Sequence, residues 1–187
     1  MRIITGKYKG RRFEVPRTFK ARPTTDFAKE NIFNVLNGYV DIEGATALDL
    51  FAGTGSITLE MLSRGCSSVV SVEADRDHAA FIRQCLEKIG VKECSLIRGD
   101  VFRFLKSSRQ QYDIIFADAP YALKALPLLP VLILLNGDPG SQSLLKPDGI
   151  FVFEHGKQYD FSSHPCFIDH RAYGSVNFTL FASSPRG

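Results

Sequence analysis

Residues 46–56, Thr-Ala-Leu-Asp-Leu-Phe-Ala-Gly-Thr-Gly-Ser, constrain the fold more than any other stretch of the chain. Residues 47–51 form a short apolar run that contains one acid, Asp49, and leads into two glycines. A run of this length that ends at glycines is typical of a buried parallel strand. From Ser56 onward the apolar residues take helical spacing. A strand, a glycine turn and a helix in this order predict the nucleotide-binding corner of a doubly wound α/β sheet.

The spacing of the two glycines decides between cofactors. A dinucleotide fingerprint needs G-x-G-x-x-G/A, but after Gly53 and Gly55 the third position is Thr58, which does not fit. The remaining pattern, D-x-F-x-G-x-G, looks like motif I of methyltransferases that use S-adenosylmethionine (AdoMet), a cofactor without phosphate. The alternatives are an ordinary glycine turn and, disfavoured by Thr58 and Phe51, a nicotinamide-dependent oxidoreductase. We therefore expect the cofactor to lie against Asp49, Phe51, Ala52, Gly53 and Gly55.

Acidic residues also follow the next two predicted strands. Ser68–Glu73 is expected to be the second strand, and Glu73 stands 24 residues after Asp49. That is close to the interval of about 20 at which an acid accepts hydrogen bonds from ribose hydroxyls. Asp100 follows the third strand, residues 94–97, and its carboxylate can accept from an exocyclic adenine amine. Capping by Glu73 and a plain turn at Asp100 are the alternatives. The predicted cofactor site then extends over Glu73, Ala74, Asp100 and Val101.

A second group of candidate residues follows the strand predicted at residues 113–117. Asp118, Pro120 and Tyr121 stand at the edge of the sheet where open α/β folds bind ligands. Methyl transfer needs an in-line nucleophile, and the exocyclic amine of a nucleobase is a poor one because its lone pair is delocalised. The Asp118 carboxylate and a backbone carbonyl of Ala119-Pro120 are expected to grip its N–H bonds, while Tyr121 offers a face to a flipped base. Ordinary turn chemistry is the alternative.

Positive charge is concentrated at the N-terminus. Residues 1–30 hold nine Lys/Arg and three acids, a net +6, whereas the remainder holds fourteen basic and seventeen acidic residues, a net −3. Gly6 and Gly10 interrupt residues 1–15, which predicts a short β-hairpin. A basic hairpin arm, residues 1–23, would precede an α/β domain, residues 24–187; a solvated arm without a partner is the alternative. The residues expected to contact nucleic-acid phosphates are Arg2, Lys7, Lys9, Arg11 and Arg12.

Composition narrows the class of protein. The 44% hydrophobic and 23% charged fractions are ordinary for a soluble globular protein. No apolar run approaches the roughly 18 residues of a membrane span, and no secretory signal is visible. The four cysteines form no C-x-x-C pair, and the four histidines show no metal-ligand spacing. We therefore expect a cytoplasmic protein with reduced thiols and no metal, which transfers the methyl group directly because no cysteine is placed as a nucleophile.

The remaining elements follow from periodicity and turn signals. They predict a mostly parallel, twisted sheet with helices on both faces. The expected segments are a helix from Thr24 or Thr25 to Asn37, a helix over 77–90, a broken helix over 123–135, a strand over 150–154 and an antiparallel hairpin over 168–173 and 177–182.

With these residues in hand, the chain resembles the bacterial 16S ribosomal RNA guanine-N2 methyltransferases of the RsmD type. The resemblance implies a Rossmann-like class I fold, AdoMet as methyl donor and direct transfer to N2 of a flipped guanine. It implies 16S rRNA as partner, within a small ribosomal subunit or an assembly intermediate, and a role for Arg22 and Thr24 in closing the AdoMet site. We also expect a monomer. The resemblance covers nearly the whole chain and rests on residues 1–12, 22–26, 33–36, 49–55, 73, 99–100, 118–121, 154–155 and 171–174.

The chain departs from that family in two places. The family usually has Asp-Pro-Pro-Tyr, and here Ala119 takes the second position; the loop at 136–143 also looks longer. The acceptor Asp118, Pro120 and the aromatic residue remain, so we expect activity. Two other hypotheses stay open. One is a DNA or RNA adenine-N6 or cytosine-N4 methyltransferase, although the chain has no room for a separate target-recognition domain. The other is a non-catalytic RNA-binding protein that retains the AdoMet fold.

Overall fold

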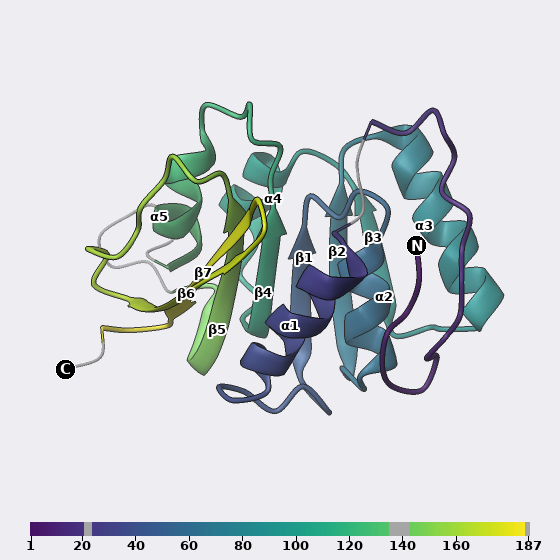
Figure 1. Ribbon diagram of the computed structural model, residues 1–187, viewed down its shortest axis with the longest axis horizontal. Coiled ribbons are helices and arrows are strands. Elements are labelled where there is room, and N and C mark those ends of the chain that lie inside the picture. The colour runs from purple at the N-terminus through teal and green to yellow at the C-terminus, as the bar shows by residue number, and fades with distance from the viewer. Residues whose placement is uncertain (21–23, 135–142, 186–187) are drawn as a thin grey trace.

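The computed structural model describes residues 1–20, 24–134 and 143–185. Their strands form one seven-stranded sheet in the order β3-β2-β1-β4-β5-β7-β6 (Figure 1). Strands β1 to β5 pair in parallel, whereas β7 runs antiparallel to both β5 and β6. The prediction of a mostly parallel α/β sheet is confirmed. The strands are β1 (Thr46–Leu50), β2 (Ser68–Glu73), β3 (Cys94–Arg98), β4 (Tyr112–Asp118), β5 (Leu145–His155), β6 (Phe167–Tyr173) and β7 (Val176–Ala182).

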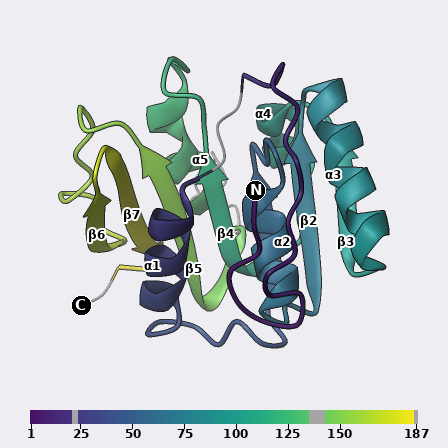
Figure 2. The same ribbon diagram turned by 45° about the vertical axis from the view of Figure 1, so that its right-hand side comes forward.

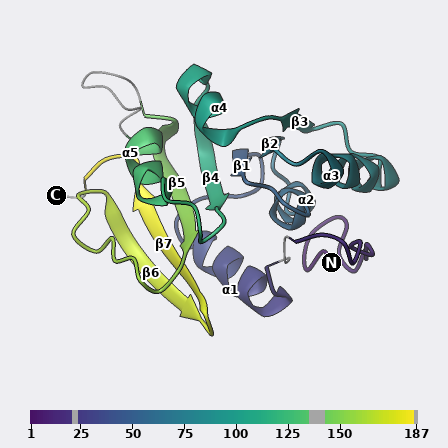
Figure 3. The same ribbon diagram turned by 90° about the horizontal axis from the view of Figure 1, so that it is seen from above.

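Helices cover both faces of the sheet, as the view from above shows (Figure 3). One face carries α1 (Asp26–Leu36), α2 (Ser56–Ser63) and α3 (Arg76–Ile89). The other carries α4 (Val101–Ser107) and α5 (Leu129–Leu134), which follows a short 3-10 turn. Successive side chains of a strand point to opposite faces, so each face has its own apolar core.

Local signals explain where the main helices begin. The Thr25 hydroxyl accepts a hydrogen bond from the Ala28 N–H at 3.2 Å and caps α1. The Asp75 carboxylate accepts from the N–H groups of Asp77 and His78 and caps α3. Among the described residues, no helix is both long and apolar enough to cross a lipid bilayer.

Most predicted elements are found within a residue or two, and two differences are informative. Helix α4 was not predicted, because seven residues carry too little periodicity to be recognised. Strand β5 begins at Leu145 rather than at residue 150, with an irregular register against β4 and a positive φ of 63° at Asp148. The predicted broken helix ends at Leu134 as described, and the rest of its range, together with most of the loop at 136–143, lies outside the described residues.

The N-terminal segment pairs less than the predicted hairpin would. Its two limbs are joined by an antiparallel bridge between Arg2 and Arg12 and by backbone hydrogen bonds from Met1 to Phe13, from Phe13 to Met1 and from Ile3 to Arg11. The pairing ends after Ile3, because the N–H groups of Ile4 and Thr5 donate to the two carboxylate oxygens of Glu60, at 2.9 and 3.0 Å. The predicted hairpin is therefore present but shorter than expected, since the Glu60 side chain of α2 takes the place of a partner strand at Ile4 and Thr5.

Residues 1–20 lie along α2 and α3 rather than projecting from the molecule (Figure 2). The chain descends to a turn beside the C-terminal end of α2, where the Lys7 N–H donates to the Ser63 carbonyl at 2.7 Å. It then rises past α3, and the ring of Phe19 lies 4.4 Å from that of His78. Ile3 and Phe13 are buried in the core below α2. The division into an arm and a domain stays a prediction.

Candidate active site

The strand register brings the predicted site residues to one level of the sheet. Leu50 pairs with Val72 on one side and with Ala117 on the other, so the next residues of β1, β2 and β4 are neighbours. Those residues are Phe51, Glu73 and Asp118. The strand order reverses between β1 and β4. Open α/β sheets bind ligands in the crevice at the carboxyl ends of such neighbouring strands, and this is where the candidate site lies.

The glycine loop after β1 is held open by its backbone conformation and by Glu73. Phe51, Gly53 and Gly55 have φ of 59°, 56° and 76°, in the left-handed region that favours glycine. The Gly53 N–H donates to one Glu73 oxygen at 2.7 Å, and the Asp75 N–H donates to the other at 2.8 Å. A Cβ on Gly55 would lie 2.9 Å from Cγ1 of Ile82. A glycine is therefore needed at Gly55.

Asp49 supports this loop from inside the protein. Its side chain is buried, and one oxygen accepts a hydrogen bond from the Thr58 hydroxyl at 2.5 Å. The Thr58 hydroxyl also lies 2.9 Å from that of Ser71. Burial raises the pKa of Asp49 to about 7. Thr58, which disqualified the dinucleotide fingerprint, is thus the partner of Asp49, and a direct contact between Asp49 and the cofactor stays a prediction.

Asp100, the third acid of the predicted cofactor site, also has a hydrogen-bond partner within the protein. Asp100 is exposed and caps α4, because its carboxylate accepts from the Arg103 N–H at 2.9 Å. The sequence left a plain turn open as the alternative at Asp100, and the residue is instead the N-cap of α4. Val101 is buried below it, and the ring of Phe102 meets that of Phe51 edge-on at 6.3 Å. These two rings form an apolar wall beside the loop.

The other predicted cofactor residues lie around the same crevice. The Ala52 N–H donates to the Val72 carbonyl at 3.1 Å, which fixes the start of the loop. Ala74 is exposed directly after Glu73, and Thr24 is half-buried just before α1. Arg22 lies outside the described residues. An acid at the end of β2, apolar rings and a glycine turn are features that nucleoside-binding sites of α/β sheets combine.

The second predicted group surrounds Asp118 and gains a residue that sequence reasoning did not assign. Asp118 is half-buried and pairs in the sheet with Glu154 of β5. Tyr121 is 43% exposed, and its hydroxyl donates to Oε1 of Glu154 at 3.1 Å. Oε2 of Glu154 is buried without a hydrogen-bond partner. Ala119 is buried and Pro120 is exposed.

Burial governs the protonation of this group. It raises the pKa of both Asp118 and Glu154, and the Asp118 charge raises that of Glu154 further. Burial and the Glu154 carboxyl likewise raise the pKa of Tyr121. Strongly shifted acids in a crevice at the edge of a sheet are candidates for a functional site.

The five basic residues expected to contact nucleic acid are exposed but do not gather in one place. Arg2 lies beside the start of α1, where its Nε is 2.9 Å from a carboxylate oxygen of Asp26. Its bridge partner is Arg12. Lys7 and Lys9 stand at the turn beside the C-terminal end of α2, which is the end away from the crevice. The structure thus separates these cations along the length of α2, and their RNA-binding role stays a prediction.

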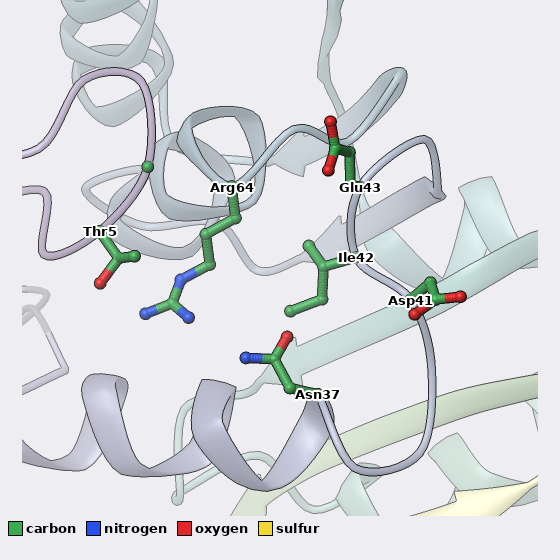
Figure 4. A pocket seen from close by; sticks show the side chains of 7 residues that line it. Thr5, Asn37, Asp41, Ile42, Glu43 and Arg64 are labelled. Carbon is green, nitrogen blue, oxygen red and sulfur yellow. The ribbon is translucent and has the colours of Figure 1, made fainter.

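A hollow of about 610 Å³ opens at the opposite end of the sheet (Figure 4). It is bounded by the ends of α1 and α2, at Asn37 and Arg64, and by residues 41–43 before β1. The Arg64 side chain points into it, but its Nε donates to Glu60 at 2.9 Å and its guanidinium lies over the ring of Phe33. Within the described residues, no cluster of His, Cys, Asp or Glu could hold a metal ion. We assign the hollow no part in the chemistry, because it lies at the amino ends of the strands.

Comparison with known proteins places the chain among methyltransferases. The Ribosomal RNA small subunit methyltransferase D of Buchnera aphidicola is 32% identical over 136 residues, which are 73% of this chain and 69% of that protein. A solved structure of yhhF from Escherichia coli, provisionally described as a methyltransferase, covers 100% of this chain and 99% of its own, with 26% identity and a TM-score of 0.84.

A more distant solved structure is similar to this chain in fold alone. The 16S rRNA N2 methyltransferase RsmC of T. thermophilus, in complex with AdoMet and guanosine, has a TM-score of 0.67 and 20% identity. It covers 88% of this chain and 45% of that chain. The architecture is that of the class I methyltransferases. A family model described as Conserved hypothetical protein 95 matches residues 1–182, and the chain therefore belongs to that family, which includes the RsmD-type methyltransferases.

Proposed function

We propose that this protein transfers a methyl group from AdoMet to the exocyclic N2 of a guanine in 16S rRNA. The observation that carries the proposal is the position of Asp118, at the end of β4, and of the exposed Tyr121 just after it; β4 pairs with β1, the strand that leads into the Gly53–Gly55 loop. Family membership supports rRNA methylation, since the Buchnera relative is named for the small ribosomal subunit.

The loop side of the crevice fits AdoMet. Glu73 stands at the end of β2 to accept from ribose hydroxyls, and the rings of Phe51 and Phe102 offer apolar surface to an adenine. Asp100 keeps a carboxylate at the rim while it caps α4. AdoMet supplies an electrophilic methyl group on a sulfonium, so the protein needs no metal to activate the donor.

The Asp118 side of the crevice fits an exocyclic amine. The carboxylate accepts a hydrogen bond from one N–H of the amine. It also stabilises the positive charge that grows on nitrogen as the new N–C bond forms. A backbone carbonyl of Ala119-Pro120 can accept the second N–H. Tyr121 presents an exposed ring on which a flipped guanine stacks. Positioning of the nucleophile in line with the methyl group supplies much of the remaining rate enhancement.

Recognition of the RNA rests on cations and on presentation of the base. The exposed residues Arg2, Arg11 and Arg12 would contact phosphates near the start of α1, and Lys7 and Lys9 would reach RNA farther from the crevice. Phosphate contacts carry little sequence information, so a guanine exposed by a small ribosomal subunit or an assembly intermediate is the substrate that fits best. The protein would act as a monomer in the cytoplasm, where such particles form.

The test uses AdoMet with a tritiated methyl group and small ribosomal subunits from cells that lack this protein. We expect label in 16S rRNA, recovered as N2-methylguanosine after digestion. Label in N6-methyladenosine or N4-methylcytidine would keep the chemistry and overturn the substrate. Binding of AdoMet without label on subunits, naked rRNA or DNA would favour a non-catalytic RNA-binding protein, and Ala119→Pro would then be the first variant to examine.

A further inference from the structure

Glu154 is a buried acid that lies directly beside Asp118 in the sheet and that the proposed function does not use. The two residues are direct neighbours across β4 and β5, and both side chains follow the strand alternation toward the face of α1 and α2. Oε1 of Glu154 accepts from the Tyr121 hydroxyl at 3.1 Å. Oε2 is buried and has no donor as long as both carboxyl groups are ionised.

A single proton shared by Asp118 and Glu154 would give the buried Oε2 of Glu154 a hydrogen-bond partner. Two carboxylates can be hydrogen-bonded to each other only when one of them is protonated, and Asp118 and Glu154 are direct neighbours across β4 and β5. Glu154 is the more buried of the two, with 6% exposure, whereas Asp118 is half-buried at the carboxyl end of β4. The proton therefore belongs on Glu154, and the charge belongs on Asp118.

The surroundings of Glu154 contain no neutralising cation within the described residues. The groups that act on its carboxyl are Asp118 of β4 and Tyr121 after it. Phe178, its partner on β7, is uncharged. The Lys29 ammonium of α1 is engaged by the Arg2 carbonyl and the Ser56 hydroxyl, at 2.6 and 3.0 Å. Asp49 of β1 adds another buried carboxyl on the same side.

We propose that Glu154 is a positioning residue for methyl transfer: protonated at neutral pH, it donates from Oε2 to Asp118 and accepts at Oε1 from Tyr121. The inference rests on the proposed function, because it assigns Asp118 and Tyr121 to the amine and the base. One side chain would then fix both groups. It would keep Asp118 ionised and aimed at the exocyclic amine, and it would hold the Tyr121 ring by its hydroxyl.

The proton balance of the reaction follows from this assignment. As the N–CH₃ bond forms and the S–CH₃ bond breaks, the amino nitrogen becomes positively charged and must release one proton. The Asp118 carboxylate accepts that proton and passes it to water after the product leaves. Glu154 keeps its own proton throughout and so remains a donor rather than a base.

A first experiment reads the proton directly and needs no substrate. Glutamates carrying ¹³C at the side-chain carboxyl are incorporated, and their chemical shifts are followed from about pH 4 to pH 9.5. One glutamate should titrate well above the usual range of about 4.3, and Glu154→Gln should remove that signal and no other. A spectrum in which every glutamate titrates below about pH 5.5 would overturn the proposal, whether or not the protein methylates RNA.

A second experiment separates positioning from simple structural support. The amide of Glu154→Gln can donate to Asp118 and accept from Tyr121, so it imitates the protonated acid. Methyl transfer by this variant should stay within about threefold of wild type at pH 7, whereas Glu154→Ala should lose about 10- to 100-fold. Wild-type activity should fall at alkaline pH as Glu154 loses its proton, and Glu154→Gln should lack that decline.

Asp113→Asn is the matched control. Asp113 is the acid at the other end of β4, where it pairs with Lys146 at 2.8 Å, and its substitution should leave the pH profile unchanged. A Glu154→Gln variant as inactive as Glu154→Ala, or one that keeps the alkaline decline, would overturn the proposal. If wild type transfers no methyl group to any RNA, the proposed function fails, and the carboxyl titration alone decides the state of Glu154.

Discussion

Two buried groups of charged side chains lie on the same side of the sheet and differ in how their charge is balanced. In the Glu60 cluster (Glu60, Lys29 and Arg64), the acid lies 3.5 Å from Lys29 Nζ and 2.9 Å from Arg64 Nε. In the carboxyl pair (Asp118 and Glu154), no described cationic side chain forms an ion pair with either acid. Glu60 and Glu154 are both buried, but only the first group contains cations that balance the charge of its acid.

The Glu60 cluster holds segments together. The Glu60 carboxylate accepts hydrogen bonds from the N–H groups of Ile4 and Thr5. The Lys29 ammonium donates to the Arg2 carbonyl and to the hydroxyl of Ser56, at the start of α2. Burial lowers the pKa of Lys29, and the Glu60 charge opposes that shift. The carboxyl pair holds nothing comparable and instead shifts its pKa values upward. A buried charge with partners indicates a structural role, and one without partners indicates a functional site.

The largest effect is expected from breaking the compensated cluster. Glu60→Ala leaves Lys29 and Arg64 buried without their acid and two backbone N–H groups without an acceptor. The free energy of unfolding, measured with urea, should fall by about 3–5 kcal/mol. Glu87→Ala, on the exposed side of α3, should cost less than about 0.5 kcal/mol. A loss below about 1 kcal/mol in Glu60→Ala would mean that the cluster does not hold the N-terminal segment.

A further buried acid that has no cationic partner among the described residues, Asp49, should make the stability of the protein depend on pH. The folded-state pKa of Asp49 is raised to about 7, so between about pH 4 and pH 7 the native state binds a proton that the unfolded chain has released. Stability therefore falls as pH rises through this range. Asp49→Asn should remove about 2–4 kcal/mol of that fall between pH 4.5 and pH 7.5, measured by urea unfolding. Equal slopes in the two proteins would show that Asp49 is ionised when folded.

The glycine loop lies between β1, which pairs with β4, and α2, which carries Glu60. A matched pair of glycines tests its shape. Gly55 and Gly90 have φ of 76° and 71°, but an added Cβ meets Ile82 only at Gly55. Gly90→Ala should cost about 1 kcal/mol from backbone strain alone, and Gly55→Ala about 2–3 kcal/mol. AdoMet affinity, measured by calorimetry, should fall only in Gly55→Ala. Equal affinity in both variants would remove the loop from the cofactor site.

The smallest effect is expected at the surface of the segment that the Glu60 cluster fixes in place. Arg12→Ala should leave stability unchanged and weaken rRNA binding uniformly. The slope of log affinity against log salt should fall in magnitude by about 0.7–0.9, the value for one lost phosphate contact. Arg83→Ala, an exposed cation on α3, provides the comparison. An unchanged slope in Arg12→Ala would leave the basic segment as a solvated surface.

Sequence patterns were enough for the parts of the site that depend on local signals. The run into Gly53 and Gly55, and the acids Glu73 and Asp118 after their strands, stand where they were predicted, because strand ends of a parallel sheet meet at one edge. The caps at Thr25 and Asp75 are equally local. What each of these residues binds stays a prediction.

Contacts between distant segments could not be predicted in the same way. Glu154 meets Asp118 only through the register of β4 and β5, which no local motif fixes. Glu60 reads as an ordinary polar position on an amphipathic helix, yet α2 is buried on all sides because residues 1–13 cover it. The same packing shortens the predicted hairpin to the pairing around Arg2 and Arg12. These residues become informative only once the tertiary structure is known.

The most direct test of the contrast between the two buried groups is the rate of a single turnover by Asp118→Asn. The variant keeps the shape of the side chain but removes the charge, so methyl transfer to small ribosomal subunits should slow by about 100- to 1,000-fold. Its AdoMet affinity should stay within about threefold of wild type, and its stability should not fall, because an uncompensated charge has been removed. A variant that transfers methyl groups at the wild-type rate would show that Asp118 does not grip the amine, and the assignment of the uncompensated acids to catalysis would be wrong.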